Sequence, residues 1–230
     1  METTIITAEV ISIIVMSILM LGSVLGSGTG DKAAWYFRAS LGSTLVGTVF
    51  DILSLLFPQI LVLNMLTYLF PVAALLFFAF YMKAVIQIKT EVPGWVMIPV
   101  VGLLGVDAAL IVIGSLTGKI IQYVNGKLYY GPWEDYASIF AFLCILYLFY
   151  LLFCYRRALS SGENWAIGIF LLFPIVDAWI TTIVYVDFTY VIVAMGFLAI
   201  YVLIQEHRGQ KEEPDPMRLS PENADKEQTE

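Results

Sequence analysis

Three carboxylates stand well inside otherwise apolar stretches of the chain, where a charged side chain needs an explanation. Asp51, Asp107 and Asp177 each occupy a different stretch. An ionisable side chain in apolar surroundings is costly, so within a membrane it usually faces the interior of a helix bundle and takes part in function. Carboxylates that gather in one place favour a cationic ligand or a metal ion, or they share protons among themselves.

Glu9 and Asn64 add two more polar groups within apolar stretches, and several aromatic residues lie near the ends of such stretches. We expect an outward-open polar pocket with Tyr68, Trp133 and Trp179 as its walls. The candidate ligand-binding residues are Asp51, Asn64, Tyr68, Asp107, Trp133, Asp177 and Trp179. An alternative interpretation stays open, in which the polar groups form hydrogen bonds that fix helix packing and the aromatic residues belong to the membrane interface.

The composition indicates that lipid covers much of the chain. Of its 230 residues 60% are hydrophobic and only 13% are charged, against about 45–50% and roughly 25% in soluble domains. The net charge is −7, and the residues from Glu206 onward contribute eight acidic and four basic side chains to it. No basic patch favours nucleic acid as a partner.

The apolar runs predict an all-α fold, a polytopic membrane helix bundle of about seven transmembrane helices, because a span needs about 20 apolar residues. Spans are expected near 4–26, 36–57, 60–84, 95–117, 136–156, 165–185 and 188–205. Residues 1–205 then form the membrane domain, and residues 206–230 a disordered charged tail. A signal peptide is the alternative for the first run, but Glu2 and the lack of a preceding basic residue disfavour it.

Lysine and arginine in the short loops orient the bundle. With the N-terminus outside, ten basic residues fall on the cytoplasmic side and two on the outer side. The outer pair is Lys119 and Lys127. We therefore expect a multi-pass protein of the cell membrane with its C-terminus in the cytoplasm. The same orientation places Glu9, Asp51, Asn64, Asp107 and Asp177 in the outer half of the bundle.

The longest outer connection, from about Gly118 to Asp135, contains Asn125-Gly126 between two strand-like runs. Asn-Gly favours a tight hairpin because both of its residues tolerate positive φ. A small outer β-hairpin is therefore predicted, with a compact linker as the alternative.

Several kinds of site are disfavoured. His207 follows the last apolar run, so no multi-histidine metal site is expected, and no histidine–carboxylate pair lies within a span to support an enzyme. Cys144 and Cys154 are ten residues apart on one expected helix, about 15 Å, which is too far for a disulfide. No cofactor is expected, and the last span has no lysine for a retinal Schiff base.

The order of features resembles the N-terminal multi-pass membrane sensor regions of bacterial signalling proteins, notably some diguanylate cyclases and histidine kinases, over roughly residues 36–205. The residues that carry the resemblance are Phe50-Asp51-Ile52-Leu53-Ser54, Leu63-Asn64, Leu116-Thr117-Gly118, Gly131-Pro132 and Pro174. It implies that an outer ligand alters the bundle and that the last helix passes the change to the cytoplasm. No output domain follows Glu206, so we expect either a chain that signals through a cytoplasmic partner or a sensor region that has lost its output domain.

Two functions are compatible with these sequence features. The first is a membrane sensor that binds an unknown small ligand in the outward-facing pocket. The second is a small-solute transporter or the substrate-binding subunit of one, which fits the size of the chain and the carboxylates within its spans. Uptake into proteoliposomes that depends on Asp51, Asp107 or Asp177 would decide for transport.

Overall fold

A computed structural model of the chain describes residues 2–26, 31–124, 127–133, 136, 139–184 and 189–212. Within these residues seven long α-helices form, and the expectation of an all-α fold is confirmed. The elements are α1 Glu2–Gly26, α2 Lys32–Leu56, α3 Leu61–Gln87, the 3-10 helix η1 Gly94–Met97, α4 Ile98–Leu116, β1 Ile121–Val124, β2 Lys127–Tyr130, α6 Ile139–Tyr155, α7 Ser161–Val184 and α8 Thr189–Glu212. Residues 213–230 of the expected tail lie outside the described residues.

The helices have the length and the surface of a membrane protein. Among the described residues four helical stretches are long and apolar enough to cross a membrane, namely Ile5–Leu25, Lys32–Leu56, Leu61–Gln87 and Gly94–Leu116. Three shorter apolar stretches are Ile139–Tyr155, Ser161–Val176 and Tyr190–Leu203. On α1 the outward side chains are apolar, and Ile18 and Leu21 are 63% and 65% exposed. Such continuous apolar exposure is rare in soluble monomers and fits contact with lipid.

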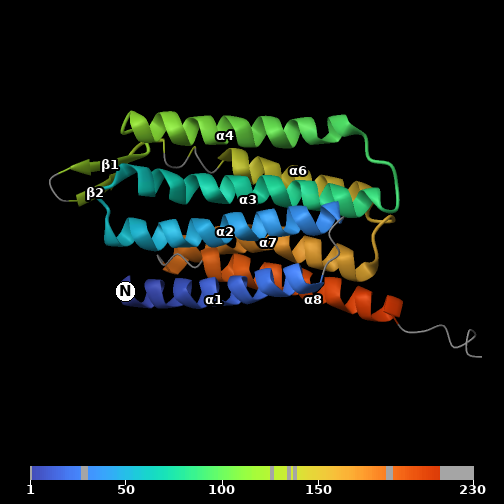
Figure 1. Cartoon of the computed structure of the whole chain (residues 1–230). Coiled ribbons are helices and arrows are strands. Elements are labelled where there is room, and N and C mark those ends of the chain that lie inside the picture. The colour runs from blue at the N-terminus through green and yellow to red at the C-terminus, as the bar shows by residue number, and fades with distance from the viewer. Residues whose placement is uncertain are drawn as a thin grey trace, which may run out of the picture.

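The helices form a closed ring in chain order (Figure 1). Each of them packs against its neighbours in the sequence, and α8 packs against α1 to complete the ring. The ring is flattened, because α3 also contacts α6 and α2 also contacts α8. As a result α4 and α1 lie at opposite edges of the bundle, with α2 and α3 between them.

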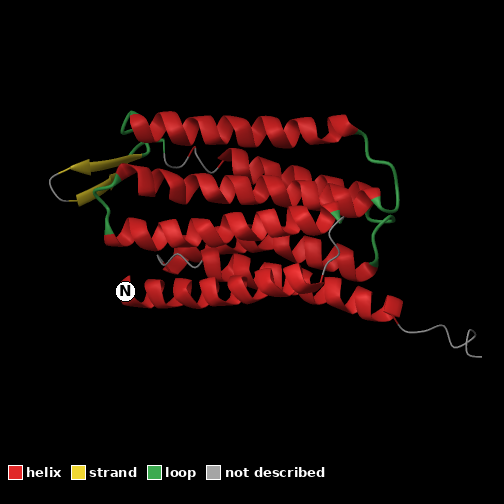
Figure 2. Ribbon diagram, in the orientation of Figure 1, coloured by secondary structure: helices red, strands yellow, loops and turns green. Residues whose placement is uncertain are grey.

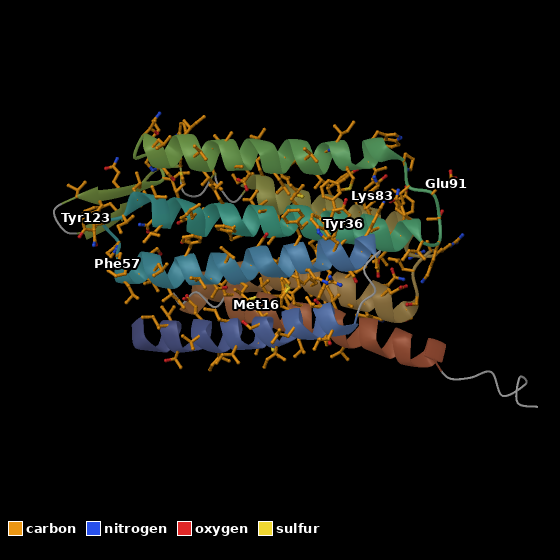
Figure 3. All side chains as sticks on the ribbon, in the orientation of Figure 1. Met16, Tyr36, Phe57, Lys83, Glu91 and Tyr123 are labelled. Atoms are coloured by element: carbon orange, nitrogen blue, oxygen red, sulfur yellow. The ribbon has the colours of Figure 1, made fainter. Side chains whose placement is uncertain are left out.

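Successive helices alternate in direction, so the bundle has two distinct ends (Figure 2). One end holds the α2–α3 turn, the start of α1 and the hairpin β1–β2, and is called the hairpin end. The opposite end holds the links between α3 and α4 and between α6 and α7, and is called the basic end because of Lys32, Lys83, Lys89, Arg156 and Arg157. Figure 3 shows Phe57 and Tyr123 at the hairpin end and Lys83 and Glu91 at the basic end.

Aromatic side chains fill the centre of the ring. Phe78 of α3 stacks on Phe170 of α7 with 4.0 Å between ring centroids. Phe170 meets Phe197 of α8 at 4.9 Å, and Phe197 meets Phe37 of α2 at 5.7 Å. All four side chains are buried. Because aromatic pairs stabilise beyond the area that they bury, by about 0.5–1.5 kcal/mol each, this cluster joins helices from both sides of the flattened ring.

Candidate ligand-binding site

Asp107 lies on the face of α4 that the bundle buries. The buried positions Val100, Leu104, Asp107 and Ile111 recur every three or four residues, which is the spacing of one helix face. The Asp107 side chain is only 1% exposed, and neither of its carboxylate oxygens has a hydrogen-bond partner. A buried carboxylate in this state is satisfied by holding a proton or by binding a donor or a cation.

The neighbours of Asp107 come from α3 and α6, because α4 packs against both of these helices. On α6 the fully buried Cys144 is close enough to Asp107 for the two groups to interact electrostatically. A thiol is at best a weak hydrogen-bond donor, so Cys144 does not compensate a carboxylate charge.

A pocket of about 220 Å³ lies beside this pair, toward the hairpin end, and it is lined by Leu110, Trp133, Tyr136 and Phe140. Leu110 is three residues beyond Asp107 on α4, and Phe140 is four residues before Cys144 on α6. At 1.5 Å of rise per residue, Leu110 is about 5 Å beyond Asp107 along the axis of α4, and Phe140 is about 6 Å before Cys144 along α6. The Asp107 carboxylate is therefore on the same helix as one lining residue of the pocket, about one turn away from it.

The strands β1 and β2 pair antiparallel, with Ile121 opposite Tyr130 and Val124 opposite Lys127. The connecting residues Asn125 and Gly126 lie outside the described residues. Gly118 reverses the chain after α4 with a φ of +68°, which glycine adopts at little cost. Ile120 and Ile121 are buried, and a Cβ atom at Gly114 would come within 2.6 Å of the Ile120 side chain. The base of the hairpin is therefore packed tightly on the end of α4.

The hairpin also positions Trp133. The Gly131 N–H donates to the Ile120 carbonyl at 2.8 Å, and the Trp133 N–H donates to the Lys119 carbonyl at 3.0 Å. The Lys119 Nζ lies 4.3 Å from the centroid of the Trp133 ring. Cations are attracted to the negative face of an indole ring, so Trp133 already has one charge on its ring at the pocket.

Asn64 and Asp51 lie apart from this pocket, at the α2–α3 turn. The Asn64 Nδ2 donates to the carbonyls of Pro58 and Ile60 at 3.2 and 3.3 Å. These bonds close the turn, which favours the packing interpretation for Asn64. Asp51 is partly buried near the end of α2, and its carbonyl accepts a hydrogen bond from the Ser54 Oγ at 2.8 Å.

The expected residues are therefore distributed over the bundle. Asp107 and Trp133 share the α4–α6 region, whereas Glu9 is buried on α1, which packs against α2 and α8. Tyr68 is partly buried on α3, against the apolar core. The side chains of Asp177 and Trp179 lie outside the side chains that the structure describes, although the backbone of α7 is described to Val184. Among the described residues no group of three or more His, Cys, Asp and Glu could hold a metal ion.

Sequence reasoning missed three of the four lining residues of the pocket, namely Leu110, Tyr136 and Phe140, as well as Cys144 near Asp107 and Lys119 on the Trp133 ring. Leu110 could have been predicted, since a residue three positions after Asp107 lies on the same side of the helix. The residues of α6 could not, because the local sequence does not indicate which helix packs against α4.

A second polar cluster lies at the basic end. The Lys89 Nζ and the Glu163 Oε2 form an ion pair of 2.7 Å, and the Ser160 N–H donates to the same oxygen at 2.6 Å. The Glu163 N–H donates to the Ser160 Oγ at 3.2 Å, which completes a capping box at the start of α7. Burial alone would raise the pKa of the Glu163 carboxyl, but the hydrogen bonds from Lys89 and Ser160 outweigh it and lower the pKa from its ordinary value.

Comparisons with models of protein families, with curated proteins and with solved structures found no match. The function must therefore be argued from the chemistry of the two clusters and from the shape of the bundle.

Proposed function

We propose that this chain is a seven-span membrane sensor that binds a small ligand in the pocket beside Asp107. The observation that carries the proposal is the Asp107 carboxylate, which is 1% exposed and has no hydrogen-bond partner on either oxygen. Proteins rarely keep such a group without a role. A ligand in the adjacent pocket would supply the missing partner.

The distribution of basic residues supports a cytoplasmic basic end and an outer hairpin end. Lys32 and Lys83, near the ends of α2 and α3, lie at the basic end together with the loop residues Lys89, Arg156 and Arg157. Basic residues near the ends of spans remain on the cytoplasmic side. In this orientation the pocket opens toward the outside, beneath the hairpin.

A physical link runs from the pocket toward the basic end. The Tyr147 Oη on α6 donates to the Val96 carbonyl in η1 at 2.9 Å. Tyr147 is three residues after Cys144, on the side of Asp107 that faces away from the pocket. A ligand that moves α6 relative to α4 would strain this bond and then the Lys89–Glu163 ion pair. We propose that a cytoplasmic signalling partner senses that change.

The filled centre of the bundle favours a sensor over a transporter. Phe37, Phe78, Phe170 and Phe197 contact one another across the ring. A solute that passed through the bundle would have to separate these stacked rings. A sensor needs only a small shift between two neighbouring helices.

Ligand screening of the full chain in lipid nanodiscs tests the proposal. We expect at least one class of small molecule to raise the melting temperature and to change the fluorescence of Trp133. Trp133→Leu should weaken ligand binding tenfold or more and so reduce both effects at a given ligand concentration. The matched control Trp165→Leu, on the exposed surface of α7, should leave binding unchanged. If no molecule stabilises the protein, or if binding ignores Trp133, the proposed site is wrong.

A further inference from the structure

We infer that the ligand of this pocket is a small organic cation, a protonated or quaternary amine with an apolar body. The inference rests on the proposed function, because it names the class of ligand for the same site. It comes from three observations, which are the lining of the pocket, its size and the unpartnered buried carboxylate of Asp107 on the same helix as one lining residue.

The lining suits an apolar body that carries a positive charge. Of the four lining residues, Trp133, Tyr136 and Phe140 are aromatic and Leu110 is aliphatic. Aromatic faces attract cations, and rings that surround a site form the cage by which proteins recognise ammonium groups. The Lys119 ammonium, 4.3 Å from the Trp133 ring centroid, already makes such a contact with one lining ring.

The volume of about 220 Å³ limits the size of the ligand. An apolar cavity of about 150 Å³ holds benzene, so this pocket takes a molecule with one ring or a short branched chain. It is smaller than the roughly 300–1,000 Å³ that drug-sized ligands occupy.

The nearest buried charge selects the sign of the ligand. Asp107 has no donor on either oxygen, and it is three residues, about one helical turn of α4, before the lining residue Leu110. An opposite charge within about 4–6 Å stabilises a carboxylate, and the interaction is stronger where the surroundings exclude water. A bare metal ion fits less well, because the described lining side chains offer it no carboxylate, imidazole or thiolate.

A matched set of three probes tests the inference on the full chain in nanodiscs. Benzylammonium, benzyl alcohol and benzoate share one ring and differ in charge. We expect benzylammonium to bind at least tenfold more tightly than benzyl alcohol in a calorimetric titration, and benzoate to bind most weakly.

Three variants complete the test. Asp107→Asn keeps the shape of the side chain and should abolish the preference for benzylammonium over benzyl alcohol. Ser115→Ala, a buried position on the same face of α4, should preserve it. Lys119→Met removes a like charge near the ligand and should tighten benzylammonium binding about twofold, whereas it would weaken binding of an anion. Each variant is first shown to remain folded by its melting temperature.

The outcomes separate the inference from the proposed function. Equal binding of benzyl alcohol, a preference that survives Asp107→Asn, or failure of benzylammonium to bind would overturn the cationic class. If benzyl alcohol or benzoate binds at least as tightly as benzylammonium and this binding depends on Trp133, the cationic class is wrong but the pocket remains a ligand site. Only the failure of every compound in a wider screen removes the proposed function as well.

Discussion

Asp107 and Glu163 are two carboxylates in opposite situations. Asp107 is 1% exposed and has no hydrogen-bond partner, whereas the side chain of Glu163 is 23% exposed and its Oε2 accepts bonds from Lys89 and Ser160. Burial normally demands partners, so the more buried group should be the better satisfied one. Glu163 therefore contributes to the packing of the basic end, whereas the unsatisfied Asp107 carboxylate is the observation on which our proposal of a ligand site rests.

Asp107→Leu is expected to have the largest effect on this contrast. Ligand binding should weaken tenfold or more, while the free energy of unfolding should rise by about 1–3 kcal/mol because a buried, unsatisfied polar group is removed. Thermal denaturation in detergent with and without ligand measures both. Val106→Leu, on the exposed side of α4, is the control and should be neutral. If Asp107→Leu lowers the free energy of unfolding and Val106→Leu does not, the carboxylate has a structural partner.

Gly114→Ala is expected to disturb the pocket although Gly114 is not one of its lining residues. The new Cβ would lie 2.6 Å from the buried Ile120 side chain, and overpacking of this kind costs about 1–3 kcal/mol. The hairpin base should shift and expose Trp133 to an aqueous fluorescence quencher. At Gly102 a Cβ meets nothing within 4 Å, so Gly102→Ala should be neutral or slightly stabilising. Equal behaviour of the two variants would show that the hairpin is not packed on α4.

Glu163→Gln is expected to have the smallest effect. Glutamine preserves the capping box, so only the partly exposed ion pair with Lys89 is lost, at less than about 1 kcal/mol. Because the pKa of Glu163 is lowered in the folded state, its contribution is complete above the ordinary glutamate pKa of about 4.3 and disappears as the pH falls through the lowered value. Melting curves from neutral to acidic pH should show wild type and variant converge. A difference in melting temperature between wild type and variant that persists at low pH would contradict the assignment of this stabilisation to the Lys89–Glu163 ion pair.

The helices were predictable from sequence because lipid imposes long apolar runs. All seven expected spans overlap a helix, although α8 continues past residue 205 to Glu212. Membrane crossing by all seven, and the outer position of the hairpin, remain predictions. The position of Asp107 on a buried helix face was also predictable, since a lone carboxylate in an apolar run usually faces the interior of a bundle; its role in ligand binding stays a prediction.

The composition of the pocket was not predictable, because it depends on which helices meet. Phe140 lines the pocket, and Cys144 lies near Asp107, only because α6 packs against α4. Asn64 was a candidate ligand-binding residue because it is a polar residue within an apolar run. Its side-chain amide donates hydrogen bonds to carbonyls of the adjacent turn. Polarity alone does not distinguish ligand binding from packing.

The closed ring has a consequence for how the molecule folds. Because the helices are neighbours in chain order, each helix after α1 can dock on the one synthesised just before it, and such local contacts form early. The contact between α1 and α8 is the exception, since it waits until the whole chain has been made. A side chain at Gly22 would collide there with Tyr201. This seam is therefore closed last, at the edge of the bundle opposite the pocket on α4.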